Sequence, residues 1–502
     1  MRVRAWVLVL GALFAVCQLA GVTGRDTPDS KNYLSYALSL RGDGKRAAAS
    51  ATIDYVCAGR GSIAARRQGV DVTRFREPGP RTRVVAACRA KEWRAVEARL
   101  RGGQVAGRTV PFASARFMRI FEARPGYPAY LVPFLVVFGV TWGVWAASVS
   151  VAVLGGVLVF LILRTLRAPP AACLTGQVLY YVLPVGTTAM RPMAEGLMLA
   201  LTLTALWGCA LVVERGRVEA GVCLIGFALA ALFAVKHSQA LFLAVCLVVA
   251  ATGFRLLRPR RGVGAIAGVG LGGVLGVVLL ARVLHFPSAS ESVQDLLTGH
   301  FAYPDRARPW GELLRLEARF WVEWLRRQLW EPLLLVSVAA GVWGVGRRRG
   351  FGVFAVAVAF TGVLTQAGHP DIGIWGGRLV VLVWVLPVVG VPLLLERAGW
   401  GPGASGGVGS VEGRARGRAA RGRAARGGGR LGAGGPLGAG VPLCATQPLS
   451  ASRAAAEALR AEQPPSASGT AGEAVRAVQP SVAAADRAAP SPRGHSCDHP
   501  TG

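Results

Sequence analysis

The stretch that decides the fold runs from residue 128 to residue 166 and reads PAYLVPFLVVFGVTWGVWAASVSVAVLGGVLVFLILRTL. It is nearly twice as long as the roughly 20 residues that span a bilayer as a helix. Pro133, Gly139 and Gly143 interrupt it. We predict that Tyr130 to Phe138 dips into the membrane and returns, and that Thr141 to Leu163 spans it.

This assignment fixes the orientation of every later segment, because two spans here would invert them all. With one span, the arginine-rich ends fall on one side, and short basic loops face the cytoplasm. These ends are Arg2/Arg4, Arg164/Arg167, Arg215/Arg217, Arg255 to Arg261, Arg347 to Arg349 and Arg397. The predicted outer ends carry Asp26/Asp29, Arg191/Glu195, Lys236/His237, His285/His300 and His369/Asp371/Arg378.

The composition agrees with a membrane protein. Hydrophobic residues make up 52% of the 502 residues, and the mean hydropathy is +0.43. We predict an all-α polytopic protein of the cell membrane with about ten transmembrane helices and both termini in the cytoplasm. The predicted regions are an uncleaved first helix (1–23), an extracytoplasmic loop (24–127), a transmembrane bundle (128–284), a second extracytoplasmic loop (285–330), C-terminal transmembrane helices (331–396) and a disordered cytoplasmic tail rich in Gly, Ala and Arg (397–502).

Some segments predict helices at the membrane surface. Lys91 to Leu100, Ser114 to Glu122 and Trp310 to Leu329 alternate apolar and charged residues at helical spacing. Within the predicted span 263–284, Gly264, Gly268, Gly272 and Gly276 recur every fourth residue, a spacing that lets another helix approach closely.

The net charge of +30 does not indicate nucleic-acid binding. The basic residues are spread over membrane-flanking loops, the outer segment and the tail, and they form no compact reading surface. Cys57 and Cys88 both lie in the predicted outer segment, an oxidising compartment, so we predict a disulfide between them.

Two carboxylates, Asp26 and Asp29, follow the first helix. Carboxylates at this place could act as a general base for a hydroxyl, with Asp29 preferred, or ligate a divalent cation. The alternative is that either residue caps the start of a helix that runs through Tyr33 and Leu40. No cofactor follows with certainty from the sequence.

Other polar residues at the predicted outer ends are candidates for binding a substrate phosphate. Lys236 and His237 interrupt an apolar run, and ionisable residues at membrane depth are costly; the alternative is a turn with Lys236 reaching the head groups. The candidate set is Arg191, Glu195, Lys236, His237, His369, Asp371 and Arg378. For Arg191 and Glu195 the alternative is an i,i+4 ion pair, and for His369 and Asp371 it is a tight turn.

Three short motifs resemble the membrane-embedded C-type glycosyltransferases that use polyprenyl-phosphate sugars, especially their actinobacterial mannosyltransferase-like branch. They are the D-x-x-x-Y pattern of Asp29 to Tyr33, the Arg-Pro-Gly-Tyr-Pro run of Arg124 to Pro128, and the Arg-Pro-x-x-Glu turn of Arg191 to Glu195. The resemblance covers residues 1 to about 396 in layout. A departure is that the outer segment is long and basic and lacks the paired Asp-Glu of protein O-mannosyltransferase relatives.

The resemblance implies an inverting transfer of a sugar from a polyprenyl-phosphate donor to a glycan, lipid or protein acceptor on the outer face. Asp29 would be the general base, with Asp26 as its partner or a metal ligand. Two alternatives stay open from the residues alone: a transporter or lipid flippase, and a non-catalytic envelope scaffold. The lack of an inverted repeat and the few midplane charges disfavour the transporter.

Overall fold

A computed structural model describes residues 3–258, 260, 262–371 and 378–396. These residues form helices and connections and no strand, which confirms the all-α prediction for this part of the chain. The tail predicted to be disordered, 397–502, lies outside the described residues.

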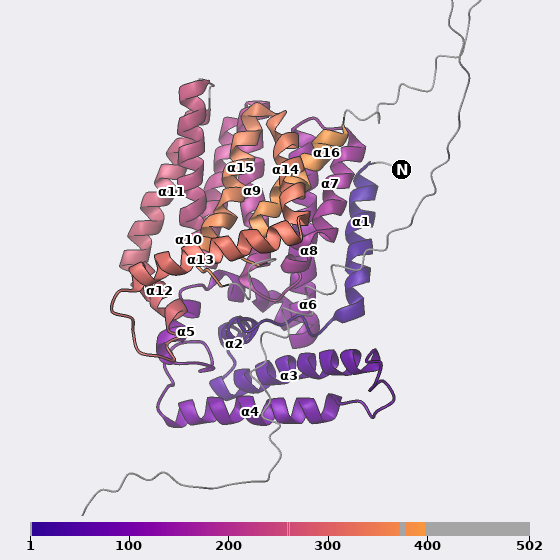
Figure 1. The fold of residues 1–502 in the computed structure, drawn as a ribbon, viewed down its shortest axis with the longest axis vertical. Coiled ribbons are helices and arrows are strands. Elements are labelled where there is room, and N and C mark those ends of the chain that lie inside the picture. The colour runs from indigo at the N-terminus through magenta and orange to yellow at the C-terminus, as the bar shows by residue number, and fades with distance from the viewer. Residues whose placement is uncertain (1–2, 259, 261, 372–377, 397–502) are drawn as a thin grey trace, which may run out of the picture. The chain divides into compact units, whose positions relative to one another are not determined.

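The helices follow one another along the chain as Figure 1 labels them. They are α1 (Val3–Gln18), η1 (Leu19–Gly21), α2 (Ser30–Arg41), α3 (Lys45–Gly69), α4 (Arg81–Arg101), α5 (Ala115–Glu122), α6 (Gly126–Thr165), α7 (Pro170–Val182), α8 (Pro184–Ala189), α9 (Ala194–Arg215), α10 (Val218–Leu257), α11 (Val263–Val283), α12 (Ala289–Leu297), α13 (Pro309–Trp330), α14 (Leu333–Gly346), α15 (Arg349–Ala367), η3 (Val381–Trp384) and α16 (Val385–Leu395).

Six of the described helical segments are long and apolar enough to cross a membrane: Val3–Gly21, α6, α9, α10, α11 and α15. A seventh is added if α13 and α14, which meet at 88°, count as one broken span. This is the architecture of a multi-pass membrane protein. The total of ten spans stays a prediction, because α6 and α10 each contain a break and the apolar segment Val381–Leu395 is shorter than a full span.

The decisive stretch breaks at Gly139, as predicted. Gly139 has φ 70° and ψ −176°, a conformation that a residue without a Cβ adopts readily. The Tyr130 hydroxyl donates a hydrogen bond to the Ala147 carbonyl at 3.0 Å. In a straight helix these residues would be about 25 Å apart. The segment before Gly139 therefore folds back along the segment that follows it.

Helix α10 folds back in the same way at Lys236, which has φ −161° and ψ 89°. Gly273 of α11 faces both arms, because a Cβ atom there would lie 2.8 Å from Leu229 and 3.3 Å from Ala244. A straight helix would hold Leu229 and Ala244 about 22 Å apart. Lys236 is thus at the tip of a helical hairpin.

Helices α2 to α5 gather at one end of the long helices, which we call the α2–α5 end (Figure 1). Eight residues of α2, including Tyr33 and Leu38, are buried, because α2 packs against α3, α5 and α6. Helix α3 was not predicted from the sequence, although its residues Ile53, Val56 and Cys57 form a buried face. The structure contains the Cys57–Cys88 disulfide, which joins α3 to α4.

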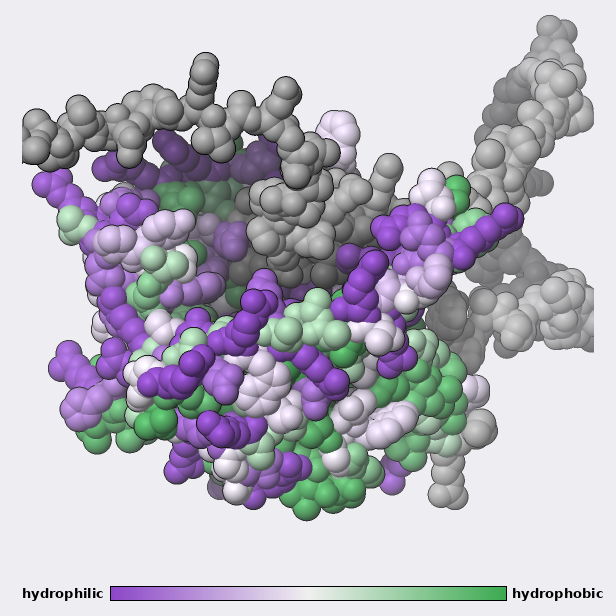
Figure 2. Space-filling view, turned by 90° about the horizontal axis from the view of Figure 1, so that it is seen from below, coloured by the Kyte–Doolittle hydropathy of each residue, from purple (hydrophilic) through white to green (hydrophobic). Residues whose placement is uncertain are grey.

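Seen from the α2–α5 end, the surface mixes many hydrophilic side chains with hydrophobic patches (Figure 2). The predicted amphipathic segments lie in α4, α5 and α13. Helix α13 runs across the long helices in Figure 1, nearly perpendicular to α14, which agrees with a helix at the membrane surface.

Three of the four glycines in the row of α11 receive no helix from the described part of the chain. A Cβ atom at Gly268, Gly272 or Gly276 would meet nothing within 4 Å among the described residues. Helix α10 packs instead against Gly270 and Gly273, on a different side of α11. The spacing of glycines indicates where an approach is sterically allowed, and the packing of neighbouring segments decides whether it occurs.

Candidate active site at the α2–α5 end

Charged residues from five separate segments meet where the long helices end beside α2. Asp29 precedes α2, Glu195 is in the first turn of α9, and Lys236 is at the tip of the α10 hairpin. Arg124 precedes α6, and Arg378 precedes η3. We call these five residues the charged cluster.

Asp29 is at the N-cap position of α2, but its side chain makes no capping hydrogen bond. The Ser30 hydroxyl accepts a hydrogen bond from the Thr27 N–H at 2.8 Å, in the turn that leads into α2. One carboxylate oxygen of Asp29 accepts a hydrogen bond from Arg378. For Asp29 the capping alternative is therefore wrong, and its carboxylate points into the charged cluster.

Arg378 bridges the two carboxylates of the cluster. Its Nε donates to Glu195 Oε1 at 3.1 Å, and its Nη2 donates to Asp29. The Glu195 side chain is 5% exposed, the Arg378 side chain 17% and the Asp29 side chain 23%. Glu195 is thus a buried holder of the guanidinium, while Asp29 is the carboxylate that solvent or a substrate can reach.

Lys236 and Arg124 add positive charge that is not neutralised by an ion pair with any described residue. Lys236 interacts electrostatically with Glu195, Arg378 and Asp29, and Arg124 interacts with Asp29 and Glu195. Neither makes an ion pair within 4.0 Å with another residue of the described part of the chain. The cluster therefore holds three cationic side chains against two carboxylates, an excess of positive charge that favours an anion.

Several buried polar atoms around the cluster have no hydrogen-bond partner among the described residues. They are Nε of Arg124, the hydroxyl of Tyr127 and Nδ1 of His237. A buried donor or acceptor without a partner costs free energy, so each one needs an explanation. A polar ligand beside the cluster would supply the partners.

A second group of residues surrounds the cluster. His369 interacts electrostatically with Asp371, Arg378 and Lys236, and burial lowers the pKa of His369 against the effect of Asp371. His300, after α12, hydrogen-bonds Asp295 at 3.2 Å. This hydrogen bond raises the pKa of His300, and the charges of Asp29 and Asp371 add to the shift. The segment after α12 therefore lies close to the cluster.

Tyr33 of α2 lies beside Arg124 of the charged cluster. Burial raises the pKa of Tyr33 to about 12, so its hydroxyl stays protonated at neutral pH. Tyr33 also hydrogen-bonds Arg124 and packs edge-on against Tyr127 at a ring distance of 5.4 Å. No site role is predicted for Arg124 or Tyr127 from the sequence, and the only signal is their place in the Arg-Pro-Gly-Tyr-Pro run.

Two predicted site residues lie elsewhere. Asp26 points to α3, where a Cβ atom on Gly59 would be 2.7 Å from its Oδ1, and it interacts electrostatically with Tyr55. Arg191 is exposed in the connection between α8 and α9. Asp26 and Asp29 therefore have different surroundings, and no group of three or more His, Cys, Asp or Glu residues in the described part could hold a metal ion.

Comparison with known proteins gives no family. No protein-family model matches the chain, and neither a curated protein nor a solved structure is similar to it. The chemistry of the charged cluster therefore has to be argued from its geometry.

Proposed function

We propose that the chain is an integral-membrane glycosyltransferase that transfers a sugar from a polyprenyl-phosphate donor to a hydroxyl of an envelope acceptor. Asp29 acts as the general base, and Lys236 and Arg124 bind the phosphate. The resemblance of the motifs around Asp29, Arg124 and Arg191 suggests this chemistry, and the charged cluster provides the groups that it needs.

The observation that carries the proposal is one part-exposed carboxylate at the ends of apolar helices, next to two cations that form no ion pair with any described residue. A general base must reach the proton that it abstracts, and a leaving phosphate needs fixed positive charge nearby. Asp29 has a second carboxylate oxygen beyond the one that accepts from Arg378. The apolar helices beside the cluster suit the prenyl chain of the donor.

The proposed reaction is a direct displacement at the anomeric carbon. The acceptor oxygen forms a bond to the anomeric carbon while the bond from that carbon to the phosphate oxygen breaks. The acceptor proton moves to Asp29, and the electron pair of the broken bond stays on the phosphate. Lys236 and Arg124 stabilise the charge that develops there, and Arg378, held by Glu195, keeps Asp29 in place.

The proposal includes the topology predicted from the arginine-rich loops. The α2–α5 end faces away from the cytoplasm, the chain crosses the membrane ten times, and both termini are cytoplasmic. The arginine-rich ends of α6, α9 and α10 lie at the opposite ends of these helices from the charged cluster, which supports this orientation.

The test is the variant Asp29→Asn with Asp26→Asn as its matched control. Membranes are supplied with lipid-linked sugar, and transfer to an acceptor is followed together with mass spectrometry of the envelope glycolipids and glycopolymers. We expect Asp29→Asn to lower transfer by a factor of about 10² to 10⁴, the usual contribution of a general base. Asp26→Asn is expected to have a smaller effect.

Both variants should be produced at wild-type levels with the Cys57–Cys88 disulfide formed. Equal transfer by Asp29→Asn and the wild type would reject Asp29 as the base. Identical envelope glycans in cells with and without the protein would reject the transferase itself.

A further inference from the structure

A cavity of about 410 Å³ lies next to the charged cluster, between α5 and the connection from α11 to α12. Arg116, Arg119 and Glu122 of α5 line one side. Residues 284–288 and Glu291 line the other. Two cavity residues separate it from the cluster: Ala123, which precedes Arg124, and Phe286, whose ring centroid is 5.3 Å from that of His237.

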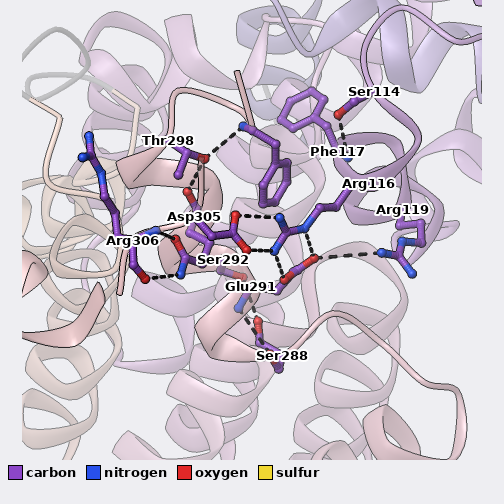
Figure 3. A network of polar contacts seen from close by, with 12 residues as sticks. Ser114, Arg116, Phe117, Arg119, Ser288, Glu291, Ser292, Thr298, Asp305 and Arg306 are labelled. Atoms are coloured by element: carbon purple, nitrogen blue, oxygen red, sulfur yellow. Dashed lines mark hydrogen bonds and ion pairs between the residues drawn. The ribbon is translucent and has the colours of Figure 1, made fainter. Parts of the chain in front are cut away.

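Most charged groups of this cavity are already engaged. Arg116 donates to both oxygens of Glu291 and both oxygens of Asp305, and it lies over the Phe301 ring at 4.1 Å (Figure 3). Glu122 accepts hydrogen bonds through Oε1 from the N–H groups of Arg108 and Thr109. These contacts fix the walls and leave few donors for a ligand.

Arg119 is the exception among the cavity cations. Its side chain is 69% exposed, and its only ion pair among the described residues is with Glu291 at 4.0 Å, the outer limit of such a contact. Its guanidinium donates no hydrogen bond to any residue in the described ranges. In Figure 3, Arg119 lies beside the Arg116 network and connects to it only through Glu291. The rim of the cavity therefore presents a guanidinium that can bind an anion.

The opposite wall includes the apolar residues Leu284 and Phe286 and continues along an exposed side of α11. The Phe286 ring stacks on Phe233 at 5.6 Å. An exposed apolar ridge runs along α11 up to Leu284, with one residue at every fourth position: Leu271, Leu275, Leu279 and Val283. This ridge ends beside Leu284, at the cavity.

We infer that the cavity binds the head group of an anionic membrane lipid, with the phosphate at Arg119 and the hydrocarbon chain on the exposed ridge of α11. The ridge supplies the apolar surface that a chain covers, and Arg119 supplies charge-assisted hydrogen bonds to the phosphate. A free phosphate would use Arg119 but not the ridge. This site goes beyond the proposed transferase, because it lies outside the charged cluster.

The experiment measures lipid binding to the purified full-length protein by native mass spectrometry. The probes are dioleoyl phosphatidic acid, dioleoylglycerol with the same chains but no phosphate, and inorganic phosphate. The variant is Arg119→Gln, and the matched control is Arg83→Gln, an exposed arginine of α4 outside the cavity. Leu279→Asn tests the ridge.

We expect phosphatidic acid to bind the wild type and Arg83→Gln equally, and to bind Arg119→Gln about tenfold more weakly, the loss of one charge-assisted contact. Leu279→Asn should also weaken phosphatidic acid, and dioleoylglycerol should bind wild type and Arg119→Gln alike. Unchanged phosphatidic acid affinity in Arg119→Gln would overturn the site. Inorganic phosphate that binds as tightly as the lipid would overturn the lipid. Neither result depends on sugar transfer, so it leaves the transferase proposal intact.

Discussion

Two arginines of this chain each bridge two carboxylates, but in different surroundings. Arg378 bridges Asp29 and Glu195 within the charged cluster, and Arg116 bridges Glu291 and Asp305 beside the cavity. The side chains of the first set are 5% to 23% exposed, whereas Arg116 is 32% and Asp305 48% exposed. In the charged cluster Lys236 and Arg124 adjoin the bridge, so that three cations face two carboxylates. The Arg116 bridge sets one guanidinium against two carboxylates, and the only addition among its described ion pairs is Arg119 at 4.0 Å from Glu291. The number of ion pairs therefore does not mark a site, whereas buried side chains whose charge is not paired do.

The largest expected effect comes from breaking the buried bridge. Arg378→Leu leaves the Asp29 and Glu195 carboxylates near each other without a guanidinium. We expect the free energy of unfolding to fall by about 3 to 5 kcal/mol, as for other broken buried pairs. The thermal unfolding midpoint of the detergent-solubilised protein measures this. The double variant Arg378→Leu with Glu195→Leu should unfold at a higher temperature than Arg378→Leu alone, because one unpaired charge is gone. A single variant as stable as wild type would contradict the buried bridge.

A smaller effect is expected from the exposed bridge. Arg116→Gln removes the contacts that hold α12 and Asp305 to α5. We expect a drop in the unfolding midpoint that is smaller than for Arg378→Leu and that shrinks with salt. Raising the NaCl concentration from about 0.1 M to about 1 M shortens the Debye length from about 10 Å to about 3 Å, which screens exposed pairs far more than buried ones. An equal salt response of both arginine variants would remove the distinction between the two regions.

The smallest effect concerns the segment that lies between the two regions. The pKa of His300 is raised by its hydrogen bond to Asp295, so protonated His300 stabilises this segment. That contribution is complete below about pH 6.5, the ordinary histidine value, and is lost as the pH rises through the higher pKa of the folded protein. We expect amide exchange of residues 296–302 to quicken above this range after correction for its intrinsic pH dependence. His300→Gln should abolish the change, and an unchanged pH profile in that variant would assign the effect elsewhere.

Some elements follow directly from the sequence. The apolar blocks predict helices because each is about as long as a bilayer is thick, and the break at Gly139 follows from a residue without a Cβ in an overlong run. The Cys57–Cys88 pair follows from two cysteines in one polar segment. Helix α3 was not predicted because small residues such as Ala48 and Ala49 make up part of its buried face beside Ile53 and Val56, which lowers the apolar contrast between its faces.

Some residues of the charged cluster could likewise be predicted from the sequence, and others could not. Asp29, Glu195, Lys236 and Arg378 are candidates from sequence because ionisable groups beside apolar segments are costly. The sequence does not indicate which of these residues contact one another. Arg124 belongs to a polar loop, where an arginine is ordinary, and the divergence of Asp26 toward α3 depends on the close approach of Gly59 to the chain before α2.

By itself, then, the sequence determined which segments are apolar, where they break and which polar residues lie at their ends, because these properties depend on neighbours along the chain. Only the tertiary structure decided that Arg378 meets Asp29, 349 positions away, and Glu195, 183 positions away. It also decided that Gly268, Gly272 and Gly276 of α11 face no other segment of the described chain. Such choices depend on how helices pack in space, and many pairings are compatible with the same local pattern.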